Sequence, residues 1–171
     1  MLSSIVKENI IKEYLVKIET DPESGRRVSE RWLLNHNDGL FLHREDGPAV
    51  QQWDAETGVL VVEGYYRFGG ESREGLPAVT ERDPRTGETL SEVWSEHGAA
   101  HRDGDKPAVW FKDPETGVIH TEEYWQLGVM GREAGPAVIH RDPQTGLIIG
   151  KEFYRAGNFE RLEGPETPSP T

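Results

Sequence analysis

The stretch HREDGPAV (residues 43–50) decides the fold, because variants of it return along the chain at a nearly constant spacing. A catalytic motif normally occurs once, whereas a motif found five times is normally architectural. The repeat therefore predicts similar units stacked in a row. The variants are SREGLPAV (72–79), HRDGDKPAV (101–109), GREAGPAV (131–138) and a degenerate ERLEGPE (160–166).

A second motif, a turn such as DPETG (113–117), lies within every unit. Proline after aspartate suits the first corner of a type I turn, the aspartate side chain bonds the backbone ahead, and glycine supplies a positive φ. We expect a hairpin loop at each copy. The turn glycines lie 29 or 30 residues apart after a first step of 33: Gly25, Gly58, Gly87, Gly117 and Gly146.

The segments on either side of this turn, such as PAVQQWD (48–54) and GVLVVEGYY (58–66), are rich in Val, Trp and Tyr, which favour strands. The prediction is an all-β fold: a curved antiparallel meander of five repeated hairpins in one domain, residues 14–166. The expected units are 14–47, 48–76, 77–106, 107–135 and 136–164, with an N-terminal cap at 1–13 and a disordered tail at 167–171.

The register of the hairpins follows from placing Asp54 opposite Val59, which sets Val50 against Glu63. Alternation of side chains then puts Val50, Val61 and Tyr65 on one face, predicted to be buried. The corresponding residues of later units are Val79, Leu90 and Trp94; Val109, His120 and Tyr124; Val138, Ile149 and Phe153.

The opposite face carries small or polar residues in most units, for example Ala49, Gly64, Thr80 and Ser95. Aromatic side chains on such a face are the usual anchors of protein interfaces. The alternative is a second hydrophobic seam or a homodimer surface. The predicted partner-binding residues are Trp53, Tyr66, Trp110, Trp125 and Tyr154, with Ile139 beside them.

Composition limits the partners. The formal net charge is −12 with a pI near 4.9, so the surface repels nucleic acid and anionic membranes and favours a basic protein. The absence of cysteine excludes disulfides and thiolate chemistry. No apolar stretch is long enough for a signal peptide or a membrane span, so we expect a soluble, cytoplasmic protein.

Two charged columns recur with the repeat: Glu30, Glu63, Glu92 and Glu122, and Arg44, Arg73, Arg102, Arg132 and Arg161. A row of carboxylates suits acid–base or metal chemistry, whereas an Arg–Glu ladder would join neighbouring hairpins. The ladder is favoured, because Lys151 replaces glutamate in the fifth unit. Histidines one repeat apart would lie about 10 Å from each other, too far to share a metal. We predict no catalytic residue, no metal and no cofactor.

HREDGPAV, together with the aromatic-x-x-x-Gly step from Tyr65 to Gly69, resembles the variant MORN-like repeats of bacterial and phage proteins over residues 14–166. The unit is longer and poorer in glycine than the usual MORN repeat. The resemblance implies a β-hairpin array that acts by binding protein, as the antitoxin or immunity half of a toxin pair.

The leading prediction is therefore a non-catalytic acidic inhibitor that covers a basic toxin or a defence nuclease. The alternative is a structural, self-assembling repeat module of a phage or cell-surface particle, which would be a homo-oligomer. A carbohydrate-binding or hydrolytic protein ranks last, because the glutamate column offers no unique carboxylate pair.

Overall fold

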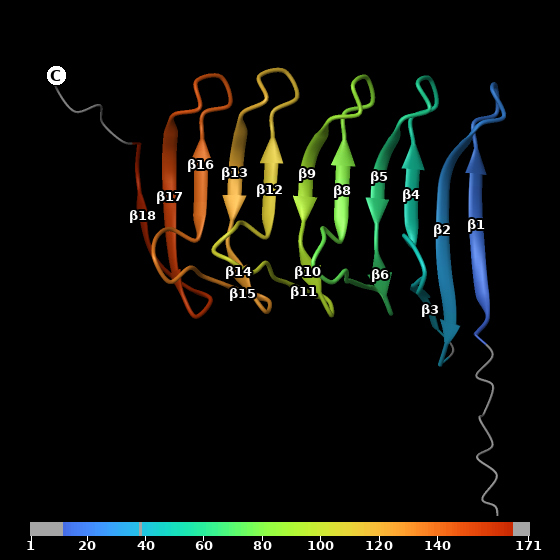
Figure 1. Cartoon of the computed structure of the whole chain (residues 1–171), viewed down its shortest axis with the longest axis horizontal. Coiled ribbons are helices and arrows are strands. Elements are labelled where there is room, and N and C mark those ends of the chain that lie inside the picture. Colours follow the sequence, from blue (N-terminus) through green and yellow to red (C-terminus); the bar gives the residue numbers. More distant parts are fainter. Residues whose placement is uncertain (1–11, 38, 166–171) are drawn as a thin grey trace, which may run out of the picture.

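The computed structural model describes residues 12–37 and 39–165. Within these ranges the chain is all-β, and a single open sheet of 12 antiparallel strands runs along the length of the molecule (Figure 1). The predicted meander of hairpins is confirmed. The predicted cap (1–13) and tail (167–171) lie outside the described residues, apart from residues 12 and 13.

The sheet strands follow one another in chain order, and each is antiparallel to its neighbours. They are β1 (Tyr14–Thr20), β2 (Arg27–His36), β4 (Val50–Trp53), β5 (Leu60–Gly64), β8 (Val79–Arg82), β9 (Thr89–Val93), β12 (Val109–Lys112), β13 (Ile119–Glu123), β16 (Val138–Arg141), β17 (Ile148–Arg155) and β18 (Asn158–Glu163). The short strand β3 (Gly39–Leu42) pairs with the end of β2.

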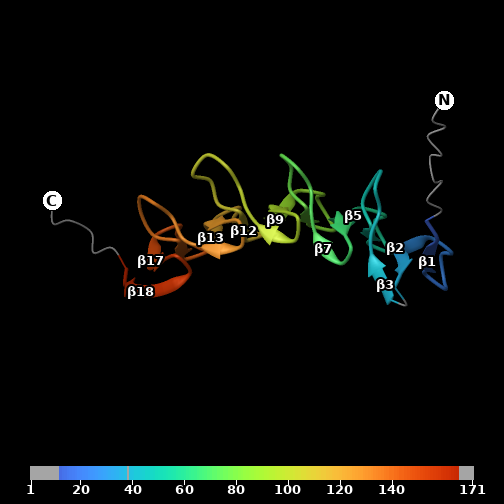
Figure 2. The same cartoon turned by 90° about the horizontal axis from the view of Figure 1, so that it is seen from below.

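Three small hairpins lie at the opposite end of the sheet from the Asp-containing turns: β6–β7 (Tyr66–Arg67, Gly70–Glu71), β10–β11 (Ser95–Glu96, Ala99–Ala100) and β14–β15 (Trp125–Gln126, Val129–Met130). Each is followed by an Arg-containing loop, and these loops extend to one side of the sheet (Figure 2). The tip glycine of one hairpin bonds the hairpin before it; Gly98 N–H, for example, donates to the Glu71 carbonyl at 3.0 Å. Neighbouring units are therefore joined beyond the sheet itself.

A β-bulge in each Asp-containing hairpin overturns the predicted register. Asp54 does close the turn with Val59, since its N–H donates to the Val59 carbonyl at 2.9 Å. The register then shifts by one residue between Gln52 and Trp53, so that Val50 pairs with Gly64 and not with Glu63. The same shift occurs in the next three hairpins. Because side chains alternate, a one-residue shift exchanges the two faces for part of each strand.

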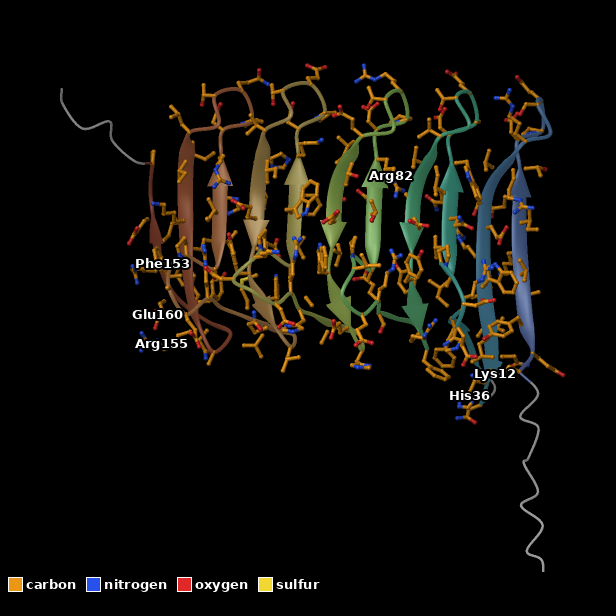
Figure 3. All side chains as sticks on the ribbon, viewed as in Figure 1. Lys12, His36, Arg82, Phe153, Arg155 and Glu160 are labelled. Carbon is orange, nitrogen blue, oxygen red and sulfur yellow. The ribbon has the colours of Figure 1, made fainter. Side chains whose placement is uncertain are left out.

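The pairing defines two faces of the sheet, and Figure 3 draws the side chains along its whole length. We call the first the ladder face; one row of cross-strand partners on it is Glu30, Gln51, Glu63, Thr80, Glu92, Trp110, Glu122 and Ile139. We call the other the valine face; its row is Val50, Gly64, Val79, Val93, Val109, Glu123, Val138 and Glu152.

The set of residues predicted to be buried together is thus divided, and the assignment was wrong. Val50 lies on the valine face, whereas Tyr65 bonds Glu63 on the ladder face. The most completely enclosed apolar side chains, at 0% exposure, are small ones that the prediction placed on the polar face: Ala49, together with Ala78, Ala108 and Ala137. A single-layer sheet encloses small side chains most easily, because no second layer covers a large one.

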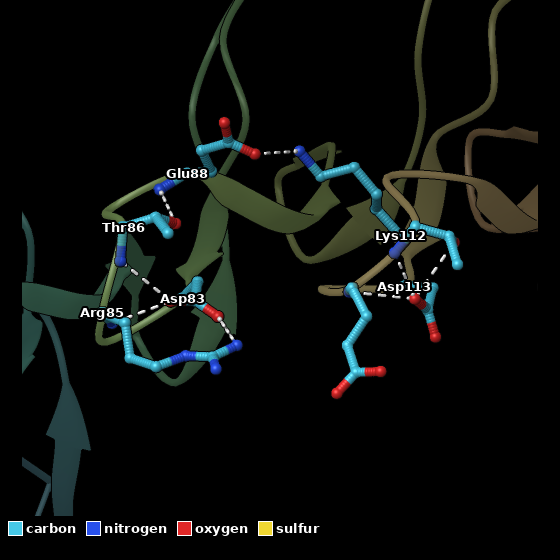
Figure 4. A network of polar contacts seen from close by, with 8 residues as sticks. Asp83, Arg85, Thr86, Glu88, Lys112 and Asp113 are labelled. Atoms are coloured by element: carbon cyan, nitrogen blue, oxygen red, sulfur yellow. Dashed lines mark hydrogen bonds and ion pairs between the residues drawn. The ribbon is translucent and has the colours of Figure 1, made fainter.

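The Asp-containing turns owe their shape to side-chain capping (Figure 4). The Asp83 carboxylate accepts the N–H groups of Arg85 at 2.7 Å and Thr86 at 2.9 Å, and Gly87 has a φ of 75°. These bonds favour the ionised form and lower the pKa of Asp83. Across the gap between neighbouring turns, Lys112 Nζ lies 3.4 Å from Glu88. The turn chemistry read from the sequence is confirmed.

Candidate interaction surfaces

The recurrent arginines form a ladder of cation–π contacts on the ladder face. Each guanidinium lies over the aromatic ring that precedes its loop, where the interaction is worth about 0.5–2 kcal/mol depending on solvent exposure. The pairs and their distances from guanidinium carbon to ring centroid are Arg44–Trp32 4.2 Å, Arg73–Tyr65 3.8 Å, Arg102–Trp94 3.8 Å, Arg132–Tyr124 4.0 Å and Arg161–Phe153 3.5 Å.

This arrangement corrects the predicted Arg–Glu ladder. Arg44 does lie 3.6 Å from Glu30, but Arg132 pairs with Asp105 at 2.6 Å, and Arg73 and Arg102 bond the carbonyls of nearby prolines. The loop arginines therefore hold the loops down by stacking on rings, and the glutamate row is left to other partners.

The glutamates of the row bond tryptophans and arginines of the strands. Glu92 accepts hydrogen bonds from Trp94 Nε1 at 2.8 Å and from Trp110 Nε1 at 3.0 Å. Glu63 lies 3.5 Å from Arg82, which projects from the neighbouring strand β8. The row is thus a set of local structural contacts rather than a paired acid and base.

The predicted partner-binding residues do not share a surface. Trp110 lies on the ladder face, half-buried, and so does Trp53, two residues after Gln51; the Arg27 guanidinium lies 5.9 Å from its ring. The other three, Tyr66, Trp125 and Tyr154, lie on the valine face. The bulge is the reason, because it shifts one part of each hairpin relative to the other.

On the valine face the aromatic side chains pack against their own strands. Trp125 Nε1 donates to Glu123 at 2.9 Å, and the Tyr154 hydroxyl donates to Glu152 at 2.9 Å. Tyr66 covers Gly64, where an added Cβ would lie 2.6 Å from the Tyr66 ring. These three side chains border the valine row at one end.

The valine row is an open apolar strip from Val50 to Val109, whereas Val138 is buried at 5% exposure. Val50, Val79, Val93 and Val109 are each only partly buried, and Phe111 beside them is 37% exposed. No second layer covers this face within the described residues. Glu81 lies among these side chains, and Glu123 and Glu152 interrupt the row, so the strip is apolar and acidic together. The sequence indicates which residue types the strands contain. It does not indicate which side chains share a face, because the bulge shifts the strand register.

The tips of the small hairpins form another exposed feature. Phe68 and Leu127 are 52% and 73% exposed and have φ values of 48° and 49°. A left-handed conformation costs a non-glycine residue roughly 1–2 kcal/mol. The sequence predicts a turn at the glycine after each tip but not the left-handed residue before it. A two-residue loop between short strands is the signal for that residue, because such a loop requires positive φ at both positions.

His43 is the largest fully enclosed side chain in the described part of the chain, with 1% exposure. Its Nδ1 accepts the Phe68 N–H at 3.1 Å, and its ring centroid lies 4.5 Å from that of Phe68. Burial lowers the pKa of His43, which keeps the ring neutral and able to accept this bond. The residue fastens the first unit to the second.

Across residues 12–37 and 39–165, no three His, Asp or Glu side chains are grouped so that they could hold a metal ion. The same residues include no helix with the length and apolar character needed to cross a bilayer.

Comparison with known proteins gives no relative: no family model, no curated protein and no solved structure matches the chain.

Proposed function

We propose that this chain is a non-catalytic protein-binding module whose valine face receives a basic protein. The observation that carries the proposal is the open valine row, which runs across neighbouring strands with carboxylates set among its apolar side chains. An apolar strip left uncovered on a sheet is the kind of surface that buries area on association. The carboxylates in the row favour a partner whose apolar contact surface is surrounded by lysine or arginine side chains.

The overall charge supports a basic partner. A net charge of −12 raises the association rate with a positively charged protein, and salt weakens this effect. Toxins that cleave nucleic acid must attract phosphate and are basic for that reason. An immunity, antitoxin or anti-defence protein that covers such an enzyme is the specific form of the proposal, and it agrees with the resemblance to MORN-like repeats.

The contacts of the glutamate row and of the turn aspartates support a structural role for these residues. The glutamate row bonds indole groups and arginines, and the turn aspartates bond backbone N–H groups that lower their pKa values. Catalytic acids and bases more often have pKa values moved toward neutrality.

The test compares two charge reversals with the same change in net charge. The native protein and the variant Glu81→Lys/Glu123→Lys, altered on the valine face, would be used to capture proteins from a lysate of the native host. The control is Glu56→Lys/Glu115→Lys, altered on exposed turn residues. We expect a basic protein to bind the native chain and the control, and the valine-face variant to bind about tenfold or more weakly.

Binding that both variants weaken equally would show attraction by net charge alone and would overturn the assignment to the valine face. Recovery of no basic protein would overturn the proposed function. A second candidate function, the self-assembling structural module, is supported by one observation: all six residues of the edge strand β18 are exposed, which favours association of two copies.

A further inference from the structure

Strand β18 (Asn158–Glu163) is the C-terminal edge of the sheet, and all six of its residues are exposed. One side of its backbone pairs with β17, and within the described residues no strand pairs with the other side. Phe159 and Leu162 are 57% and 63% exposed. An exposed edge strand with large apolar side chains is a template for pairing with another chain.

The strand stands where the first strand of a further unit would stand. Within the array, Glu123 of β13 pairs with Val138 of the next unit; at the end of the array, Glu152 pairs with Leu162. Residues 160–163 of the degenerate copy ERLEGPE therefore lie in an edge strand, where the equivalent residues of earlier units lie in a loop. Arg161 still stacks on Phe153, which is labelled in Figure 3, so the ladder of the earlier units extends to this edge.

A bulge sets which side chains of β18 share a face. Phe159 pairs with Tyr154 and Leu162 with Glu152, and the register shift between these pairs leaves Glu160 as the extra residue. Tyr154 and Glu152 are two residues apart in β17, so Phe159 and Leu162 lie on the same face, the valine face. Glu160 pairs with Arg155 at 3.0 Å.

We propose that the chain forms a symmetric dimer in which β18 pairs antiparallel with β18 of a second copy, so that two sheets become one. Full antiparallel overlap of the six residues sets Phe159 of each copy opposite Leu162 of the other, and Glu160 opposite Arg161. Apolar pairs and opposite charges are the cross-strand partners that stabilise a sheet. The strand is complementary to itself.

The other edge of the sheet lacks this property. Full antiparallel overlap of β1 (Tyr14–Thr20) with itself sets Lys17 against Lys17, and like charges directly opposite are unfavourable. Pairing through β18 alone uses the same surface on both copies, and such an interface closes at two chains. The expected assembly is a dimer and not a filament. This inference does not depend on the proposed basic partner.

The first test measures mass in solution with the purified chain alone, by sedimentation or light scattering over a range of concentrations. We expect the mass of two 19.3 kDa chains at high concentration. Leu162→Lys on β18 should weaken the dimer about tenfold or more, whereas the matched control Ile18→Lys on β1 should leave it unchanged. Both positions are exposed, and circular dichroism would confirm that both variants fold.

The second test fixes the register, and the absence of native cysteine makes it simple. A mixture of Phe159→Cys and Leu162→Cys chains should form a disulfide-linked heterodimer on mild oxidation, well above the yield from either variant alone. Three results would overturn the proposal. The native chain could stay monomeric, Ile18→Lys could dissociate the dimer, or either cysteine variant alone could form as much disulfide-linked dimer as the mixture. A monomer that still binds a basic protein would leave the proposed function standing.

Discussion

Single residues at the hairpin tips hold conformations that their side chains disfavour. Phe68, His97, Leu127 and Ala156 all have φ values close to +50°. Asn37, at the corresponding turn of the first unit, has the same conformation and is a residue that tolerates it. Local strain of this kind remains only where the surrounding structure imposes it, here through the two-residue turn and the tip glycine bonded to the preceding hairpin.

Replacement of Leu127 by asparagine should stabilise the protein. The leucine side chain is 73% exposed, so its loss removes little packing, while asparagine accepts the left-handed conformation. We expect about 1 kcal/mol of added stability in urea unfolding. Leu127→Val is the control, since a β-branched residue suits positive φ less well and should destabilise. An asparagine variant no more stable than the native chain would mean that the leucine makes a compensating contact.

Within the elements, the turn chemistry could be read from the sequence and the strand pairing could not. Aspartate, proline and glycine have conformational preferences of their own, so the loop at Asp113–Gly117 followed from local residues alone. The bulge at Leu60–Val62 involves branched apolar residues that fit either face, so no local preference indicated where the register would shift. The same limit applies to the site: the aromatic residues could be found, but not the face each of them occupies.

The stacking of arginines on aromatic rings could not be predicted from sequence patterns either. Arg102 and Trp94 come into contact only because the loop folds back over the sheet. A charge pattern pairs each arginine with an opposite charge, whereas the flat guanidinium also stacks well on an indole ring. The ring also shields the arginine from water, and this burial lowers the pKa of Arg102.

A double-mutant cycle should show that this stacking stabilises the fold. We expect Arg102→Gln to lower the free energy of unfolding by about 1–2 kcal/mol, and by much less in a Trp94→Leu background where the ring is absent. Urea unfolding followed by circular dichroism gives the four values. Equal losses in the two backgrounds would assign the effect of Arg102 to its bond with the Pro107 carbonyl at 3.1 Å.

The whole molecule is a row in which each strand pairs only with its neighbours. Its contacts therefore join neighbouring strands, and within the described residues there is no common core that all units share. Each unit after the first has its own fully enclosed alanine directly before its first strand, so each unit has a small buried site of its own. These residues are Ala49, Ala78, Ala108 and Ala137.

The cost of a defect should accordingly depend on its position in the row. Ala108→Leu and Ala137→Leu each force a large side chain into a site with 0% exposure, which costs about 1–3 kcal/mol. Ala108 lies directly before β12, in the middle of the row, and its replacement should uncouple the two halves of the sheet; hydrogen exchange should then become faster on both sides, and the thermal unfolding transition should broaden. Ala137 lies directly before β16, and its replacement should affect only the last strands, so that amides of β2 to β9 keep their native protection. If both variants instead lowered protection along the entire sheet by the same factor, the row would unfold as one unit, and its stability could not be a sum over neighbouring pairs.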